Sequence, residues 1–160
     1  MAHKFDKIDL KILSDLQQHG RLTNVELARR AGISAPPCLR RVRSLETMGT
    51  IRGYHAQVNP TSLGFTVTIY AKVSLESHSD IDLKEFEERV KSWPLVRECH
   101  MLTGDADFLL KVVAENWDSY QEFLTSILTK TEHVKNVKSE LVLRSVKDVP
   151  GVPVETIAAF

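Results

Sequence analysis

Hydrophobic positions in the first fifty residues recur with helical spacing in three short segments. The first segment runs from Asp6 to Gly20. The second runs from Thr23 to Gly32 and opens with the spacing of a capping box. The third begins at Ser34, a favourable N-cap residue. The apolar stripes consist of Ile8, Ile12, Leu13 and Leu16, then Val25, Leu27 and Ala28, then Cys38, Leu39, Val42 and Leu45. This pattern predicts three helices, the last two joined by a tight turn, as in a helix-turn-helix.

The third predicted helix starts with two consecutive prolines, Pro36 and Pro37. With Ser34 as the N-cap, both fall in the first turn, where a backbone N–H has no intrahelical partner. We therefore expect them to stiffen the start of the helix. On a helical wheel, Arg41 lies at the margin of the side that faces away from the apolar stripe. That side carries Pro36, Arg40, Arg43, Ser44 and Thr47.

A change of pattern follows residue 50. Gly53 and Pro60 interrupt a stretch in which Ile51, Tyr54 and Val58 are the apolar positions. This is typical of a short hairpin or an extended arm. The sequence thus indicates a domain over residues 1–50 and a linker hairpin over 51–64.

Beyond Gly64 the hydrophobic pattern alternates between strand and helix spacing. Strands are predicted over residues 65–77, 95–104, 107–115 and 134–147, and helices over residues 79–93 and 117–128. The order βαββαβ predicts a ferredoxin-like domain over residues 65–148, with both helices on one face of the sheet. The whole chain is thus of the α+β class, and residues 149–160 are expected to form an extended tail.

The second face of this sheet is predicted to be apolar. Its side chains would include Tyr70, Met101, Leu109, Val113 and Val142. Such a face is too apolar to be exposed to water, so we expect a second sheet to cover it in a homodimer.

Composition and charge narrow the classes of protein to which the chain could belong. The chain is 42% hydrophobic and 26% charged, with no apolar run near the ~20 residues that cross a membrane. No secretory signal is evident, and Cys38 and Cys99 lack metal-like spacing, which favours reduced thiols in the cytoplasm. Residues 1–60 hold ten Lys/Arg and five Asp/Glu, whereas residues 61–160 hold eleven and sixteen. The basic front half could face a polyanion.

Together, the three predicted helices and the basic charge favour DNA binding. Arg40 and Arg43 would reach guanine edges or phosphates in a major groove, and Ser34 or Arg52 would contact a phosphate. The residues expected to bind DNA are Asn24, Ser34, Pro36, Pro37, Arg40, Arg41, Arg43, Ser44, Thr47 and Arg52. The alternative is a small three-helix bundle whose basic face is only solvated.

No catalytic residue, metal site or cofactor is expected, because the histidines are scattered and no nucleotide-binding or hydrolase motif occurs. The turn Gly104–Asp107 admits two interpretations. It could be an ordinary hairpin turn. Alternatively, backbone N–H groups near Gly104 would bind a carboxylate, and Asp105 or Asp107 an ammonium group, so that the turn would receive a free amino acid.

Two stretches resemble the Lrp/AsnC family of transcription regulators. They are SAPPCLRRVRSLETMGTI, from Ser34 to Ile51, and VRECHMLTGDADFLLKV, from Val96 to Val112. The resemblance extends from about Phe5 to Lys147 and is nearest to the leucine-responsive branch. It implies a winged or plain helix-turn-helix joined to a ferredoxin-like effector module. It also implies dimers that assemble into tetramers or octamers, and an amino acid that alters assembly or DNA affinity.

By position, the resemblance places the DNA-binding motif between Asn24 and Arg43. It implies an effector site formed by Met101, Thr103, Gly104, Asp105, Ala106, Asp107, Trp117, Glu140, Leu141 and Val142. Leucine-responsive relatives have aromatic residues at the positions of Ala106 and Glu140, which points to a different ligand, or none. The function favoured is a cytoplasmic, nucleoid-associated regulator that binds double-stranded DNA and an amino acid. The alternatives are a ligand-insensitive architectural DNA-binding protein and a metabolite-sensing or enzymatic ferredoxin-like protein.

Overall fold

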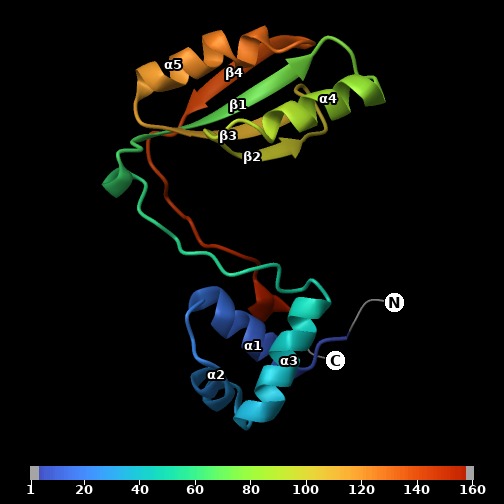
Figure 1. Ribbon diagram of the computed structural model, residues 1–160, viewed down its shortest axis with the longest axis vertical. Coiled ribbons are helices and arrows are strands. Elements are labelled where there is room, and N and C mark those ends of the chain that lie inside the picture. Colours follow the sequence, from blue (N-terminus) through green and yellow to red (C-terminus); the bar gives the residue numbers. More distant parts are fainter. Residues whose placement is uncertain (1–3, 158–160) are drawn as a thin grey trace. The chain divides into compact units, whose positions relative to one another are not determined.

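The computed structural model describes residues 4–157 and divides into two compact units (Figure 1). The first unit contains the chain up to Val58 together with the residues from Lys147 onward. The second unit is Asn59–Val146. The C-terminal segment, which the sequence sets apart as a tail, therefore belongs to the first unit, although its last residues, 158–160, lie outside the described part.

The first unit is the predicted bundle of three helices. They are α1 (Lys7–Gln18), α2 (Asn24–Ala31) and α3 (Ala35–Thr47). The core of the bundle comes from the predicted apolar stripes and consists of Ile12, Leu27, Ala28, Cys38 and Leu45. Val25 and Leu39 depart from the prediction, because 68% and 38% of their surfaces remain exposed.

Capping boxes begin both α1 and α2, although the sequence predicts only the one at α2. Asp6 accepts hydrogen bonds from backbone N–H groups at the start of α1, and the side chain of Asp9 accepts one from the N–H of Asp6 in return. Thr23 and Glu26 form the same reciprocal pair at α2. Gly32 then ends α2 with φ of 71°, a left-handed conformation that glycine adopts without strain. These local signals fix the helix boundaries.

The predicted hairpin after α3 is wrong. Within the described chain, no strand forms between Met48 and the short 3₁₀ turn η1 (Thr61–Leu63). The segment is instead irregular and largely exposed. The second alternative left by the sequence, an extended arm, is the one observed.

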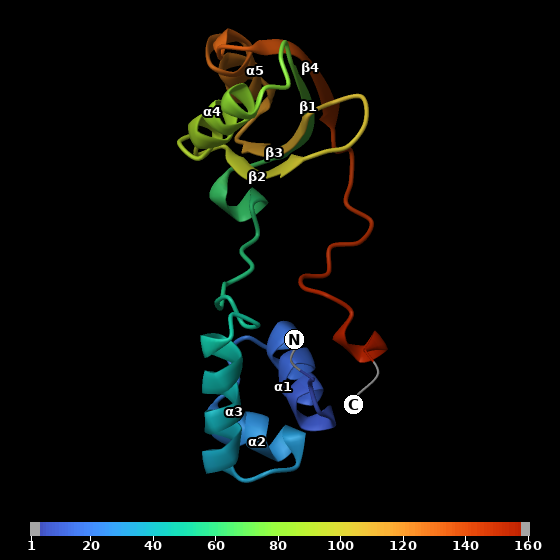
Figure 2. The same cartoon turned by 90° about the vertical axis from the view of Figure 1, so that its right-hand side faces the viewer.

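The second unit has the predicted ferredoxin-like order. Its elements are β1 (Val67–Leu75), α4 (Asp80–Val90), β2 (Val96–Met101), β3 (Phe108–Ala114), α5 (Trp117–Ser126), the 3₁₀ turn η2 (Leu128–Lys130) and β4 (Val134–Leu141). The strands pair antiparallel in the order β2-β3-β1-β4. Both helices cover the same face of the sheet (Figures 1 and 2).

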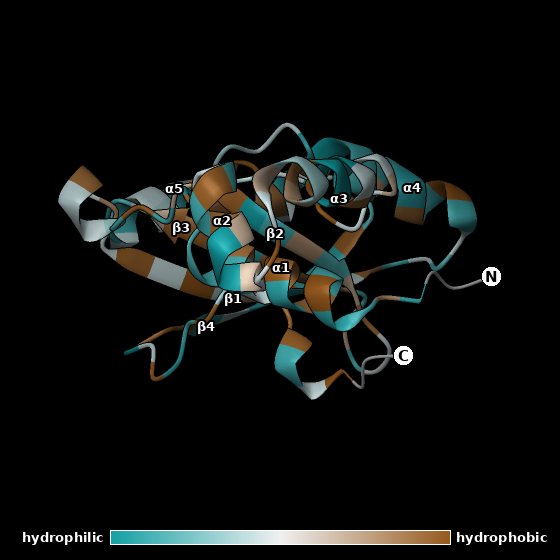
Figure 3. Ribbon diagram, turned by 90° about the horizontal axis from the view of Figure 1, so that it is seen from below, coloured by the Kyte–Doolittle hydropathy of each residue, from teal (hydrophilic) through white to brown (hydrophobic). Residues whose placement is uncertain are grey.

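Alternation along the strands separates the two faces of this sheet (Figure 3). The helix-covered face buries Ile69, Ala71, Val73, Phe108, Leu110 and Val112 under Phe86 of α4 and Tyr120 and Phe123 of α5. The opposite face is less apolar than predicted. Although Tyr70, Leu109 and Val113 alternate onto it, it also carries ion pairs between Lys72 and Glu140, 2.9 Å apart, and between Lys111 and Glu98, 2.8 Å apart.

Met101 does not lie on that open face. It pairs in register with the buried Phe108, so its side chain belongs to the helix-covered side. A bulge between Val96 and Glu98 explains the error, because one extra residue reverses which side chains face the helices. Leu143 and Ile81, predicted as apolar packing positions, are 90% and 76% exposed.

Candidate nucleic-acid interface and ligand cavity

The outward side of α3 carries the residues that the helical wheel predicts. Its exposed side chains are Pro36, Arg40, Arg43, Ser44 and Thr47. Among the described residues, neither Arg40 nor Arg43 has an ionic or hydrogen-bonding partner for its guanidinium group. Two cationic side chains one helical turn apart are therefore available to an anionic partner.

Arg41 has a different role from its two neighbours. Its Nη1 donates to Asp6 Oδ2 at 2.8 Å and to Asp9 Oδ1 at 2.7 Å, which joins α3 to the start of α1. These bonds raise the pKa of Arg41, chiefly through Asp9. The pKa of Asp6 is lowered, first by the backbone N–H of Asp9 and also by Arg41. Arg41, predicted as a DNA contact, is thus engaged within the bundle.

Of the other predicted DNA-binding residues, Asn24 makes a hydrogen bond within the bundle, whereas Ser34 and Arg52 are exposed. Asn24 Nδ2 donates to the carbonyl of Ala35 at 2.8 Å and so braces the turn that leads into α3. Ser34 precedes α3, but its hydroxyl makes no capping bond, and the residue is exposed. Arg52 is exposed in the extended arm. Leu39, placed in the core by the wheel, also reaches the surface of α3, where an apolar side chain can contact a thymine methyl group.

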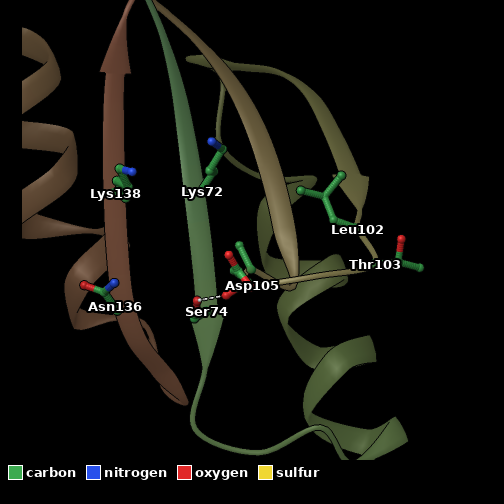
Figure 4. Close-up of a pocket in the computed structure, with 8 residues that line it drawn as sticks. Lys72, Ser74, Leu102, Thr103, Asp105, Asn136 and Lys138 are labelled. Carbon is green, nitrogen blue, oxygen red and sulfur yellow. Dashed lines mark hydrogen bonds between the residues drawn. The ribbon is translucent and has the colours of Figure 1, made fainter.

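A cavity of about 360 Å³ opens beside the turn between β2 and β3 (Figure 4). Three of its residues were predicted as effector-binding, namely Thr103, Asp105 and Ala106. The others come from the turn and from the open face of β1 and β4, and they are Lys72, Ser74, Leu102, Asn136 and Lys138. Sequence reasoning missed this second set because it depends on β4 pairing beside β1, which brings Lys72 opposite Lys138.

Charges of both signs surround the cavity. Lys72 Nζ lies 2.9 Å and Lys138 Nζ 3.9 Å from Glu140 Oε1. The hydrogen bond from Lys72 is the main cause of the lowered pKa of Glu140. Asp105 lies on the turn, close to Ser74 and across from the two lysines (Figure 4). The cavity thus offers ammonium groups from the sheet and a carboxylate from the turn, which is the arrangement that complements a zwitterion.

Asp107 of the predicted effector set stabilises the fold instead. Its Oδ2 accepts the backbone N–H of Leu75 at 2.7 Å, and its Oδ1 lies 2.9 Å from His78 Nε2. Both contacts hold the turn against the end of β1. Gly104 has φ of 128° and shapes the exposed turn without lining the cavity.

Five further members of the predicted set lie outside the cavity. Trp117 begins α5 and packs against Tyr120 with ring centroids 5.5 Å apart. Met101 lines a separate groove with Val90 and Phe108. Leu141 is the last residue of β4 and Val142 follows it, and the N–H of Val142 donates to the carbonyl of Thr68. Glu140 acts on the cavity only through its lysine partners.

The described residues contain no group of three or more His, Cys, Asp or Glu side chains placed to hold a metal ion. Their helices are also too short or too polar to cross a membrane. Cys38 is buried, and burial raises the pKa of the Cys99 thiol to about 11.

Comparison with known proteins matches both units. Residues 5–52 match the family described as winged helix-turn-helix DNA-binding, and residues 68–152 match the Lrp/AsnC ligand binding domain. The chain is 54% identical over 145 residues to the leucine-responsive regulatory protein of Rhizobium meliloti (strain 1021), covering 91% of this chain and 93% of that protein.

Two further proteins similar to the chain are also transcriptional regulators. The Bkd operon transcriptional regulator of Pseudomonas aeruginosa is 43% identical over 143 residues, covering 89% of this chain and 94% of that protein. The crystal structure of a transcriptional regulator from Neisseria meningitidis, in complex with L-Met, superposes with a TM-score of 0.90 at 35% identity, covering 94% of this chain and 97% of that one. With its helix-turn-helix, its ferredoxin-like ligand-binding domain and these relatives, the chain belongs to the Lrp/AsnC family of DNA-binding transcriptional regulators.

Proposed function

We propose that this regulator recognises a specific DNA sequence through the outward side of α3 and that a free amino acid, bound in the cavity beside the β2–β3 turn, alters its DNA affinity or assembly. The observation that supports the DNA contact is that the guanidinium groups of Arg40 and Arg43 have no partner within residues 4–157. Arginine is the side chain best suited to guanine edges and phosphates. The tie between Arg41 and α1 holds this surface in place.

The DNA contact is tested by Arg40→Ala and Arg43→Ala. Each should weaken operator binding by about 1–3 kcal/mol and, where the lost contact is to a phosphate, lower the slope of log K against log salt by about 1. Arg97→Ala, which removes an exposed arginine from the second unit, is the control and should bind like the parent. Unchanged affinity in both α3 variants would refute this assignment of the DNA-binding surface.

The cavity supports a zwitterionic ligand on two grounds. Its volume of about 360 Å³ is within the roughly 300–1,000 Å³ typical of small-molecule sites. Lys72 and Lys138 supply donors for a carboxylate, whereas Asp105 supplies an acceptor for an ammonium group. The L-Met complex of the related regulator from Neisseria meningitidis supports the same ligand class.

The ligand is tested by adding each of the twenty amino acids to the purified protein and measuring its melting temperature and its mass by light scattering. We expect one or a few to raise the melting temperature, because a ligand that binds only the folded state stabilises it. Asp105→Asn should abolish that rise. Asp80→Asn, an equal change of charge at the exposed start of α4, should retain it. A panel without any response would favour a ligand-insensitive DNA-binding protein.

The same light-scattering measurement tests assembly. Half-buried Tyr70, Leu109 and Val113 on the open face of the sheet support pairing with a second copy. We therefore expect a mass of at least two chains. A mass of one chain at all concentrations would contradict a dimer formed through this face.

A further inference from the structure

The chain returns to the first unit after β4, and residues 154–156 lie against α1 (Figure 2). A short 3₁₀ turn, η3 (Val154–Thr156), packs on this helix, and Val154 is only 4% exposed. Gln17 of α1 binds the same segment through both atoms of its side-chain amide. Its Nε2 donates to the carbonyl of Val152 at 3.0 Å, and its Oε1 accepts the N–H of Val152 at 2.7 Å. A surface side chain thus satisfies both backbone groups of one tail residue.

Gly151 shows how closely the tail approaches α1. Its φ of +86° lies in the left-handed region. A Cβ atom at this position would also lie 2.0 Å from Gln17 Oε1. Gly64 has the same φ of +86°, but no atom lies within 4 Å of where its Cβ would be. Residue 151 therefore requires glycine for two reasons, its positive φ and its close contact with α1. At Gly64 only the positive φ applies.

The residues before the docked segment provide little packing of their own. Leu143 and Val146 are 90% and 86% exposed, and Val149 is 71% exposed. The tail is therefore held mainly by the Gln17 pair and the buried Val154. These contacts are few and local, so the segment is suited to detach without unfolding either unit.

We propose that residues 151–157 are a segment that docks on α1. This segment acts as a fourth element of the DNA-binding unit and links that unit to the ligand-binding domain. The occupant is the tail of the same chain. Docking restrains α1, and α1 carries Asp6 and Asp9, which hold Arg41 of α3. The tail also continues from β4, whose Asn136 and Lys138 line the cavity. The ligand-binding domain is thus connected to the DNA-binding unit at both of its ends, by the arm before η1 and by the tail.

Docking is tested in the full chain without DNA or ligand, so that this test is independent of the proposed function. Hydrogen exchange of the α1 amides is measured for the parent, Gly151→Ala and Gly64→Ala. The added Cβ displaces the Gln17 side-chain amide and breaks both of its bonds to Val152, so Gly151→Ala should raise α1 exchange by about tenfold. Gly64→Ala has the same backbone strain without the clash and should leave α1 exchange unchanged.

A double-mutant cycle separates contact from backbone strain. In a Gln17→Ala background the atom that meets the new Cβ is gone, so Gly151→Ala should add little further exchange. Additive effects of Gln17→Ala and Gly151→Ala would overturn the docking geometry. So would unchanged α1 exchange in a chain that ends at Lys147. An effect of the tail that vanishes on dilution would show that the occupant is the tail of a second copy and would overturn docking within one chain.

The link to DNA rests on the proposed function and has its own measurement. Because docking restrains α1 and thereby Arg41, Gly151→Ala should weaken operator binding several-fold, and Gly64→Ala should not. If Gly151→Ala loosens α1 but leaves the operator Kd unchanged, the segment docks without serving DNA binding and that part of the proposal fails. If Arg40→Ala and Arg43→Ala also leave the Kd unchanged, the fault lies in the proposed DNA-binding surface.

Discussion

Arg41 binds two carboxylates through Nη1 of its guanidinium group, those of Asp6 and Asp9 at the start of α1. Asp9 is largely buried, with 11% of its side chain exposed, so loss of this partner would leave a buried polar group without its ion pair. The same pair of carboxylates also forms the capping box of α1. Arg41 therefore joins the middle of α3 to the N-terminal start of α1.

Replacing Arg41 should destabilise the DNA-binding unit. Arg41→Ala leaves Asp9 partly buried without its cation, and we expect a loss of about 1–3 kcal/mol in the free energy of unfolding. Arg40→Ala, which removes an exposed and unpartnered side chain, should change stability by less than about 0.5 kcal/mol. The free energies of unfolding of the two variants are measured by urea unfolding followed by circular dichroism. Equal stabilities would show that the Arg41 ion pairs contribute nothing.

The helical wheel could place Arg41 only at the edge of the outward side of α3. It could not name Asp6 and Asp9 as partners, because those residues are more than thirty positions away and meet Arg41 only when α1 packs against α3. The same reason hid Lys72 and Lys138 from the predicted ligand site. Roles that depend on one element were predictable here, whereas roles that depend on the packing of two elements were not.

The helices begin as their sequences predict because the signals that start them are local. The capping boxes at Asp6 and Thr23 each lie within four residues, and Pro36 and Pro37 occupy the first turn of α3 as expected. The errors have longer-range causes. The bulge in β2 puts Met101 on the face opposite to the predicted one, and the arm after α3 does not pair with itself.

The capping carboxylates predict how stability depends on pH. Backbone hydrogen bonds lower the pKa of Asp6 and of Glu26 below their ordinary values of 3.8 and 4.5. The unfolded chain therefore takes up protons first as the pH falls. The stabilisation from both groups is present above those ordinary values and is lost as the pH falls through the lower folded values.

We therefore expect the DNA-binding unit to lose stability below about pH 4.5, in a range set by these two groups. The loss should be smaller in Asp6→Asn and Glu26→Gln, which start less stable at neutral pH but have one fewer titrating cap each. Urea unfolding from about pH 6 down to about pH 2.5 measures this dependence. A pH dependence that neither substitution alters would mean that other carboxylates control it.

The charge division along the sequence anticipated the two units of the molecule. Residues 1–60, which contain α3, hold ten Lys/Arg and five Asp/Glu. The alternation of hydrophobic and polar positions after Gly64 indicates the sheet of the second unit. The return of the tail to the first unit was not predictable, because Gly151, Val152 and Val154 give no periodic signal. Their role follows only from the contact with Gln17.

Regulation of the whole molecule requires that the ligand bind the two functional states with different affinity. The direct measurement is the operator Kd, at one fixed salt concentration, with and without the amino acid that raises the melting temperature. We expect the Kd to change by about fivefold or more, which corresponds to a coupling of about 1 kcal/mol, and we expect Asp105→Asn to remove the change. An amino acid that stabilises the protein but leaves the operator Kd and the assembly mass unaltered would contradict a ligand-controlled regulator.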